Sequence, residues 1–461
     1  MFPDQDKRII VVLVSAALIL RIALLLFGLF AAGQEYFFSF DDARGYFSLA
    51  QNLAEGRGYT VNYSGVEYPE TGRTPGYPLL IALSMELFQS AVPLIVLQLA
   101  MGSILPILAY LLTLRLFAHR LAAIAAAAFF AFDPLVIALA TLLMTETIFM
   151  TLFIGALLIF LRAFDGNNIG WRPLAIAGLL FSFATELRPV LLYALPVLAI
   201  YLMYMLMRDK ITGRAIAAFI VFVAATSTFI FPWMARNYKQ AGIFELTSLS
   251  GTVAYFYAGS SILSIAEGKS FNDARQELRA IAKATGIAEL RDPKNTPYFK
   301  KEAMRIAREH PKETALLAGF SIFHLMTHDG YLDTSLQTGI LKSAPQSVPQ
   351  ISAVARGEFG KLFGVAEQFL KGPWLIFIIA RLVWIAIAAL AFIGMCYTLL
   401  ERKQDRPQML MVLGILIAIT LATLPVALGM HGRLRIPMDV FIIPLAVIGW
   451  QTIYWALRKA P

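Results

Sequence analysis

Two adjacent carboxylates, Asp41 and Asp42, follow Phe40 a short distance beyond the first long apolar stretch of the chain. A carboxylate placed there can accept a proton from an attacking hydroxyl group or hold a divalent cation. Glu146, which follows Thr145 at the edge of a later apolar stretch, offers the same chemistry. Each acid also has a structural alternative, because acidic side chains commonly cap helices, begin them or pair with an arginine.

Five arginines stand at the edges of apolar stretches, several of them close to prolines that interrupt helices. The planar guanidinium group forms paired hydrogen bonds with phosphate oxygens and stays charged at ordinary pH. For any single arginine, a structural ion pair or a contact with a lipid head group is the alternative. Together they predict at least one phosphate contact, and the candidates are Arg73, Arg188, Arg236, Arg433 and Arg435.

His324 and His328 are four residues apart, which places both imidazoles on one face of a helix. This spacing would suit zinc or a similar ion. A closed metal site needs more ligands than two, however, and the sequence fixes no third one. These histidines are the candidate metal ligands, and the cofactor is left open, with a divalent metal ion as one alternative.

The elements that position these side chains are predicted to be membrane helices. Of the 461 residues, 58% are hydrophobic and 15% are charged, which is far more apolar than the core of a soluble domain requires. Spans of about 20 residues leave room for about ten transmembrane helices and one polar insertion. The expected fold class is therefore an all-α polytopic membrane protein with an outer-face helical region.

The first apolar stretch, Ile9 to Phe30, is too long for the core of a cleaved signal peptide and predicts a membrane helix. Arg21 within it is costly in lipid, so we expect it to face the bundle interior, an acidic partner or a water-filled cavity. The other predicted spans are Ala91–Leu114, Leu121–Ala140, Thr145–Leu161, Pro173–Glu186, Val190–Met207, Ala215–Trp233, Trp374–Leu400, Gln408–Leu428 and Met438–Leu457.

The charge distribution predicts the orientation of these spans. The net charge is +9, and an excess of basic residues in a membrane protein usually lies on the cytoplasmic face, so it does not indicate nucleic-acid binding. A cytoplasmic amino terminus places basic loops such as Arg402 with Lys403 inside. Both termini are then cytoplasmic, and the loop 31–90 and the insertion 235–373 lie outside.

Residues 1–461 are expected to form a single membrane domain. Loop 31–90 carries the candidate catalytic acid, and insertion 235–373 should consist mainly of amphipathic helices. The segment Thr314–Met326 is apolar but brief, and counting it as a span would invert the charge distribution of everything after it. We therefore expect it to be interfacial or re-entrant.

Several enzyme signatures are missing from the sequence. There is no Walker loop, no G-x-S-x-G elbow, no H-E-x-x-H pattern and no dinucleotide-binding glycine pattern. ATP-driven transport and serine hydrolysis therefore lose support. Cys396 is the only cysteine, which excludes an intramolecular disulfide and a cysteine-based zinc site.

Several short motifs follow one another in an order that resembles the GT-C membrane glycosyltransferases. The longest is D-x-x-x-Y-x-x-L-A-x-x-L-x-x-G-x-G-Y from Asp42 to Tyr59, followed by R-T-P-G-Y-P from Arg73. Later come T-E, L-R-P, P-W-M-A-R-N and G-R-L-R-I-P, which begin at Thr145, Leu187, Pro232 and Gly432. Within that superfamily, the chain resembles bacterial protein-mannosyltransferase-like and aminoarabinose-transferase-like enzymes.

This resemblance implies roles for individual residues. Asp42 matches the catalytic acid of the first outer loop, which makes Asp41 the second candidate, and Arg73 matches a basic residue that contacts the donor phosphate. Glu146 matches an acid that could orient the acceptor or share a metal with Asp42. Where the aminoarabinose enzymes carry an acid before the basic residue, this chain has Gly72.

The resemblance implies transfer of one sugar from a polyprenyl-phosphate donor to a lipid, glycan or protein acceptor at the outer face of a bacterial inner membrane. Asp42 would serve as general base in a direct displacement that inverts the anomeric centre. Two alternatives remain: a transporter or flippase of lipid-linked saccharides, and a non-catalytic lipid-binding or assembly subunit.

Overall fold

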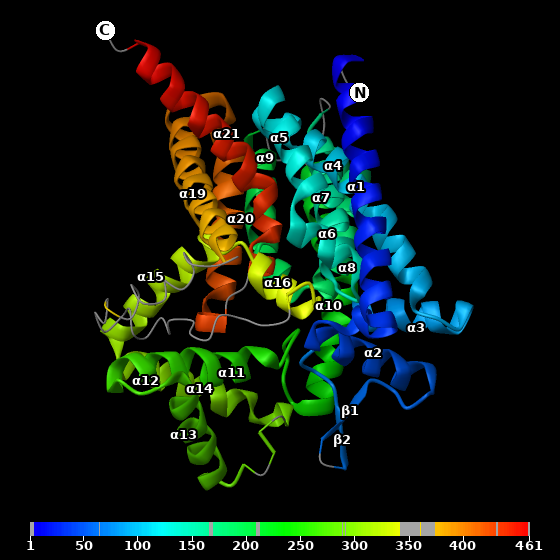
Figure 1. The fold of residues 1–461 in the computed structure, drawn as a ribbon, viewed down its shortest axis with the longest axis vertical. Helices are drawn as coiled ribbons and strands as arrows, with labels where there is room; N and C mark the ends of the chain where they lie inside the picture. The colour runs from blue at the N-terminus through cyan, green and yellow to red at the C-terminus, as the bar shows by residue number, and fades with distance from the viewer. Residues whose placement is uncertain are drawn as a thin grey trace.

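A computed structural model describes residues 4–63, 65–165, 169–208, 213–287, 289–290, 292–341, 360, 374–429 and 432–459. The last part of the predicted insertion, residues 342–359 and 361–373, lies outside these ranges. Long helices stand side by side as a bundle, and a layer of short helices lies across one end of it (Figure 1). Both chain termini lie at the opposite end.

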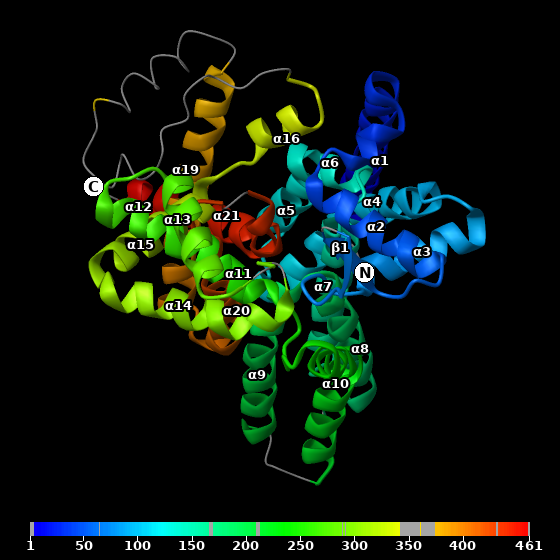
Figure 2. The same ribbon diagram turned by 90° about the horizontal axis from the view of Figure 1, so that it is seen from below.

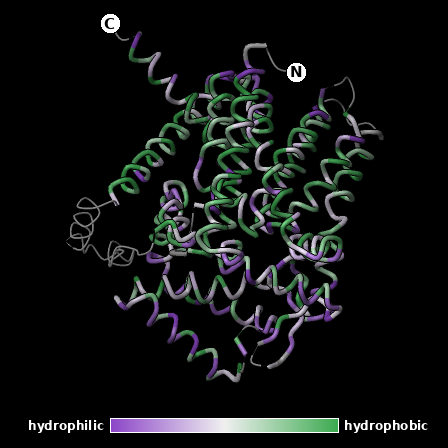
Figure 3. The backbone as a smooth tube through the Cα atoms, turned by 45° about the vertical axis from the view of Figure 1, so that its right-hand side comes forward, coloured by the Kyte–Doolittle hydropathy of each residue, from purple (hydrophilic) through white to green (hydrophobic). Residues whose placement is uncertain are grey.

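Among the described residues, the bundle contains ten helical segments, which correspond to the ten predicted spans. By length and composition alone, eight helices among the described residues could cross a membrane, or nine if the bent pair α5 and α6 is one span. Apolar residues line the bundle, and polar residues gather at its two ends and in the end layer (Figure 3). The segments are α1 (Asp4–Ala32), α4 (Val92–Phe117), α5 (Arg120–Phe132) with α6 (Pro134–Thr141), α7 (Glu146–Arg162), α8 (Trp171–Leu187), α9 (Leu195–Arg208), α10 (Gly213–Ala241), α19 (Leu375–Glu401), α20 (Arg406–Thr423) and α21 (Ile436–Lys459).

One of the eight apolar helical segments is Leu249–Glu267, which we predicted to be part of the outer insertion. It comprises α11 (Leu249–Val253), a π-helical turn η3 (Ala254–Gly259) and α12 (Ser260–Glu267). Figure 1 shows α11 and α12 lying across the end of the bundle, beside the amphipathic helices α13 (Phe271–Ala284) and α14 (Thr296–Glu309). Its apolar side chains pack against those helices in a small separate core.

Helix α15 (Pro311–Thr327) contains the brief apolar segment of the insertion. It runs obliquely at the end of the bundle, and it is not among the apolar helices long enough to cross a membrane (Figure 1). A short helix, α16 (Tyr331–Gln337), follows it. This arrangement agrees with the interfacial alternative.

The loop after α1 contains elements that the sequence did not predict. A 3₁₀ turn, η1 (Gly33–Phe38), leads into α2 (Asp41–Ala54), and a hairpin of β1 (Thr60–Tyr63) and β2 (Val66–Pro69) pairs Thr60 with Pro69. The apolar helix α3 (Gly76–Phe88) ends the loop. Seen from below, these elements cover one half of the bundle's end and α11 to α15 cover the other (Figure 2).

Local sequence explains where the helices that carry the charged residues begin and end. Phe40 precedes α2 in an extended conformation, and its side chain makes no capping hydrogen bond. The helix begins at the next residue, so Asp41 and Asp42 both lie in its first turn. Glu146 likewise opens α7, and Arg188 is extended because the following Pro189 disfavours a helical conformation at that position. The two acids therefore lie at helix amino termini, where the helix dipole favours a carboxylate.

The buried arginine of the first helix behaves as predicted. Arg21 is fully buried, and its two terminal nitrogens donate to the carbonyl oxygens of Ala17 at 3.0 Å and Phe130 at 2.9 Å. Backbone carbonyls thus pair both terminal nitrogens of this cation inside the bundle, whereas its Nε is buried without a hydrogen-bond partner among the described residues.

We predict that both termini and the loop around Arg402 face the cytoplasm, because only this orientation puts the basic loops inside. A periplasmic reporter enzyme fused after Lys403 should be inactive, and the same reporter within the loop 31–90 should be active. Periplasmic activity of the Lys403 fusion would show that α15 spans the membrane and that the orientation is wrong.

Candidate active site

One ion pair at the bundle's end joins residues that are almost four hundred positions apart. Arg433 lies on the 3₁₀ turn η7 (Gly432–Leu434), and its Nη2 donates to Oδ2 of Asp42 at 2.6 Å. Nη2 of Arg73 lies 3.6 Å from Oδ1 of the same carboxylate. Both oxygens of Asp42 thus face a guanidinium group, and each of the three side chains remains partly exposed.

A second acid–arginine pair lies beside the first. Glu146 forms an ion pair with Arg188, and its Oε1 is 4.0 Å from Nη1 of Arg433. Arg433 therefore bridges the two carboxylates. The side chain of Glu146 is only 4% exposed, whereas that of Asp42 is 34% exposed, so Asp42 is the acid that a substrate can reach.

These side chains line a cavity of about 160 Å³. Its walls come from α2, the start of α7, the break between α8 and α9, and η7. The lining residues are Asp42, Tyr46, Thr145, Glu146, Leu187, Arg188, Pro189, Val190 and Arg433. Three of the five predicted arginines, Arg73, Arg188 and Arg433, are thus brought to two of the three predicted acids, Asp42 and Glu146.

The surrounding cations determine the charge state of Asp42. Partial burial alone would raise the pKa of this carboxyl group, but the charges of Arg433, Arg73 and Arg188 outweigh it and hold the pKa below its usual range. Burial, together with the neighbouring Asp42 and Glu146, raises the pKa of Tyr46 to about 12. Near neutral pH the site therefore contains an ionised Asp42 and a protonated tyrosine hydroxyl.

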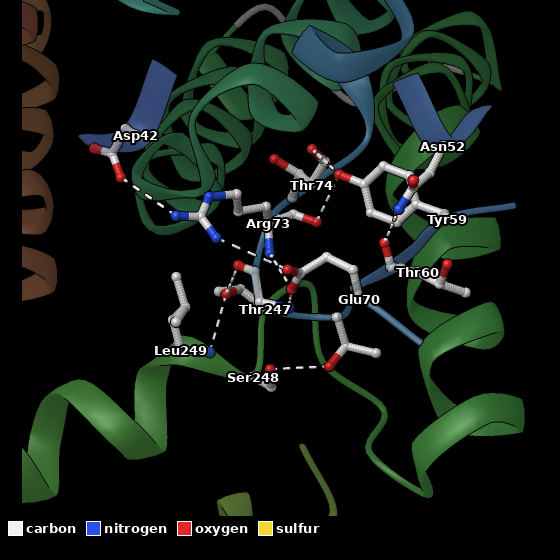
Figure 4. Close-up of polar contacts among 12 residues, drawn as sticks. Asp42, Asn52, Tyr59, Thr60, Glu70, Arg73, Thr74, Thr247, Ser248 and Leu249 are labelled. Carbon is white, nitrogen blue, oxygen red and sulfur yellow. Dashed lines mark hydrogen bonds and ion pairs between the residues drawn. The ribbon is translucent and has the colours of Figure 1, made fainter. Parts of the chain in front are cut away.

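Glu70 contacts Arg73 beside the candidate site, and the sequence analysis missed it. Its Oε1 accepts hydrogen bonds from the backbone N–H groups of Gly72 and Arg73, the latter at 3.0 Å, and its Oε2 lies 3.8 Å from Nη1 of Arg73. Figure 4 shows the Arg73 side chain between Asp42 and Glu70. The only sequence signal was an acid three residues before the arginine.

Gly45 leaves the space that Arg73 occupies. A β-carbon at this position of α2 would lie 2.8 Å from the guanidinium carbon of Arg73. The same guanidinium group lies 5.8 Å from the centre of the Tyr46 ring, close enough for a cation–π contact. The approach of Arg73 to Asp42 therefore depends on a glycine one turn after the acid.

Arg236 lies outside the cavity and binds the hairpin to α10. It donates to the carbonyl oxygens of Glu70 and, at 3.0 Å, of Tyr59, and its guanidinium carbon is 4.7 Å from the Trp233 ring. Asp41 is next to Asp42 in the sequence, but its side chain is exposed and does not line the cavity. The structure thus places both residues at the edge of the site.

Arg435 is buried in a separate network. Its Nε donates to Asp439 at 2.9 Å, and its Nη1 donates to the carbonyl oxygens of Leu325, Met326 and His328 at the end of α15. Its guanidinium carbon lies 3.4 Å from the centre of the Trp384 ring. Only 1% of Arg435 is exposed, so it braces the turn that carries Arg433 and does not line the cavity.

The two predicted metal ligands lie close together, with ring centres 4.6 Å apart. Nδ1 of His324 is 2.9 Å from a nitrogen of Arg381, and Nδ1 of His328 accepts from the backbone N–H of Gly432 at 3.2 Å. Within the described residues, no three His, Cys, Asp or Glu side chains gather as a metal site would require. Between Asp42 and Glu146, the position that a shared metal would take is filled by the guanidinium group of Arg433.

Comparison with known families supports the resemblance inferred from the sequence. Residues 72–237 match the model of the dolichyl-phosphate-mannose-protein mannosyltransferases. The match contains Arg73, Glu146 and Arg188, whereas Asp42 and Arg433 lie outside it. The match covers just over a third of the chain, and it confirms the predicted resemblance to GT-C glycosyltransferases. No curated protein sequence matches the chain.

Among solved structures, the chain is similar to an oligosaccharyltransferase of Archaeoglobus fulgidus. The form crystallised with zinc and sulfate is 13% identical, with a TM-score of 0.48, and the alignment covers 98% of this chain and 49% of that one. The oligosaccharyltransferase AglB with an inhibitory peptide and a dolichol-phosphate is 13% identical, with a TM-score of 0.45 and coverages of 100% and 52%. The chain thus spans about half the length of the structures that it matches.

We predict that Arg435→Met lowers the free energy of unfolding by about 3 to 5 kcal/mol, because it leaves the Asp439 carboxyl group buried without its partner. The double variant Arg435→Met/Asp439→Leu should recover most of this loss. Arg458→Met, at an exposed arginine of α21, the helix that carries Asp439, is the matched control. Thermal unfolding in detergent measures all three, and a double variant no more stable than Arg435→Met would argue against the ion-pair account.

Proposed function

We propose that this chain is a membrane glycosyltransferase that transfers one sugar from a polyprenyl-phosphate donor to an acceptor at the outer face of a bacterial inner membrane. The observation that carries the proposal is an ionised, accessible Asp42 that lines the cavity and is paired with Arg433 and Arg73, with Arg188 in the same cavity wall. The match of residues 72–237 to the mannosyltransferase model supports the same class of reaction.

The position of the cavity favours a lipid-linked donor. It lies among the ends of the bundle helices, on the side opposite the termini, which the charge distribution assigns to the outer face. Nucleotide sugars are made in the cytoplasm, so a sugar used at the outer face must be carried across by a lipid. A phosphate at the membrane edge would meet arginines suited to bind it.

The proposed chemistry is a direct displacement at the anomeric carbon. The acceptor hydroxyl oxygen forms the new bond to this carbon while the bond from the carbon to the donor phosphate oxygen breaks. Asp42 takes the hydroxyl proton, and the phosphate leaves with the bonding electrons. Inversion follows from attack opposite the leaving group. A phosphate is already a good leaving group, so the second acid that a glycosidase uses to protonate its leaving oxygen is not needed.

The ion pairs of the empty cavity suggest how Asp42 becomes basic. A carboxylate held by arginines has a low pKa and is a weak proton acceptor. A donor phosphate competes for the same guanidinium groups of Arg433 and Arg73, and binding it would release Asp42 from them. The arginines would then stabilise the leaving phosphate as its charge grows, while the pKa of Asp42 rises.

Glu146 has a positioning role in this proposal. Its ion pair with Arg188 and its 4.0 Å approach to Arg433 fix both arginines at the cavity wall. Its low exposure leaves little room for direct contact with an acceptor. Stabilisation of the leaving phosphate is assigned to the arginines, because Arg433 fills the space between the two acids.

We predict that Asp42→Asn lowers sugar transfer by about 10² to 10⁴-fold, the usual contribution of a general base, because an amide keeps the shape but cannot accept the proton. Asp41→Asn, at the neighbouring exposed acid, should be close to wild type. Both variants should be assayed as purified protein in nanodiscs with a polyprenyl-phosphate sugar. Full transfer by Asp42→Asn would remove Asp42 as the base, and transfer from a nucleotide sugar without a lipid carrier would overturn the donor assignment.

The pH profile tests the charges around Asp42. The fall of kcat/KM at low pH, its acidic limb, reports the pKa of the group that must be ionised in the free enzyme, which here is Asp42. The midpoint of this limb should therefore lie below the usual pKa range of a carboxyl group. Arg433→Gln removes the strongest of the cations that lower the pKa, and the limb should move to higher pH. Arg44→Gln, which breaks an exposed pair with Glu35 and a cation–π contact with Phe38, should leave this acidic fall in activity at the same pH. An unchanged limb in Arg433→Gln would show that Asp42 does not set it.

A further inference from the structure

A second cavity lies away from the candidate active site, between α9 and the beginning of α20. Its volume is about 370 Å³, and its wall is formed by Val197, Ile200, Tyr201, Tyr204, Arg406, Pro407, Leu410 and Met411. The two helices are antiparallel, and Val197 on α9 packs next to Gly414 on α20. The cavity therefore runs along the helices from the level of Val197 to the end of the bundle near Arg406, on the side of the chain termini.

This groove is apolar along its length and cationic at one end. Ile200 is 70% exposed and Leu410 is 55% exposed, as expected of side chains that face acyl chains in a spanning segment. Arg406 is exposed and belongs to the lining, and its Nε donates to the carbonyl oxygen of Leu399 at 3.0 Å, which fixes the plane of its guanidinium group.

Further polar groups surround the same end. The hydroxyl of Tyr201 is hydrogen-bonded to Gln408, and Arg115 and Arg208 lie near enough to act electrostatically on this tyrosine. Arg406 is thus the cation that lines the end of a groove that is otherwise hydrocarbon-like, whereas Arg115 is already paired with Asp165. An occupant that fits both parts has an apolar chain of about 10 Å or more, given the rise of 1.5 Å per helical residue, and an anionic head.

We propose that this groove binds one anionic phospholipid of the leaflet on the side of the chain termini, with an acyl chain against Ile200 and Leu410 and the phosphate at Arg406. A zwitterionic lipid offers the same chain, but its amine opposes the arginines, so the charge favours a lipid such as phosphatidylglycerol. The bound lipid would contact both α9 and α20. It is separate from the donor site, which lies at the other end of the bundle.

Native mass spectrometry of the intact protein, released from micelles that contain phosphatidylglycerol or phosphatidylcholine, tests this proposal. Wild-type protein should retain one phosphatidylglycerol more tightly than any phosphatidylcholine. Arg406→Gln should lower that retention at least several-fold, whereas Arg406→Lys should keep part of it. Arg458→Gln, at an exposed arginine outside the groove, should retain the lipid as wild type does.

A second variant separates the groove from the general attraction of a basic surface. Ile200→Trp fills the apolar part without changing any charge, and it should lower retention of phosphatidylglycerol as Arg406→Gln does. Because phosphatidylglycerol binds the folded protein, it should also raise the Tm of wild type more than that of either variant. Equal retention of both lipids by wild type, or wild-type retention by Ile200→Trp, would overturn the proposal.

Discussion

The structure depends on one constraint, which is that neither lipid nor a protein core solvates a charged side chain. A guanidinium group inside or at the edge of a bilayer must find carboxylates, carbonyl oxygens or water, and three arginines of the bundle show how. Arg21 uses backbone carbonyls, Arg435 uses Asp439 and the end of α15, and Arg433 uses Asp42. Only the last of these pairs remains open to a substrate.

The buried pairs position the exposed one. Arg435 and His328 hold the turn that carries Arg433 against the end of α15, and there is no room for a side chain at Gly432, where a β-carbon would lie 2.8 Å from the carbonyl oxygen of Asp329. On the other side, the hairpin is held by Arg236 and presents Arg73 to the same carboxylate. Asp42 thus meets two cations from opposite ends of the chain.

The sequence predicted the features that follow from hydrophobicity and charge. The spans, the inward-facing Arg21 and the placement of Asp42, Glu146 and several arginines at one face follow from helix length, the cost of burying charge and the distribution of basic loops, all of which can be read from the sequence. The sequence could not show that Arg73 and Arg433 contact Asp42 whereas Arg236 does not. That difference depends on contacts between distant segments, such as the hydrogen bond from the backbone N–H of Ser248 to the carbonyl oxygen of Thr71. The hairpin and Glu70 were missed for the same reason.

The central claim is that a donor phosphate replaces Asp42 as the partner of Arg433 and Arg73. The most direct measurement is a cryo-EM structure of the protein in nanodiscs with bound polyprenyl phosphate. The account predicts the phosphate between these two arginines, with Asp42 moved out of hydrogen-bonding distance of Arg433. A phosphate bound away from both arginines, or an Asp42–Arg433 pair that stays intact beside the bound lipid, would contradict it.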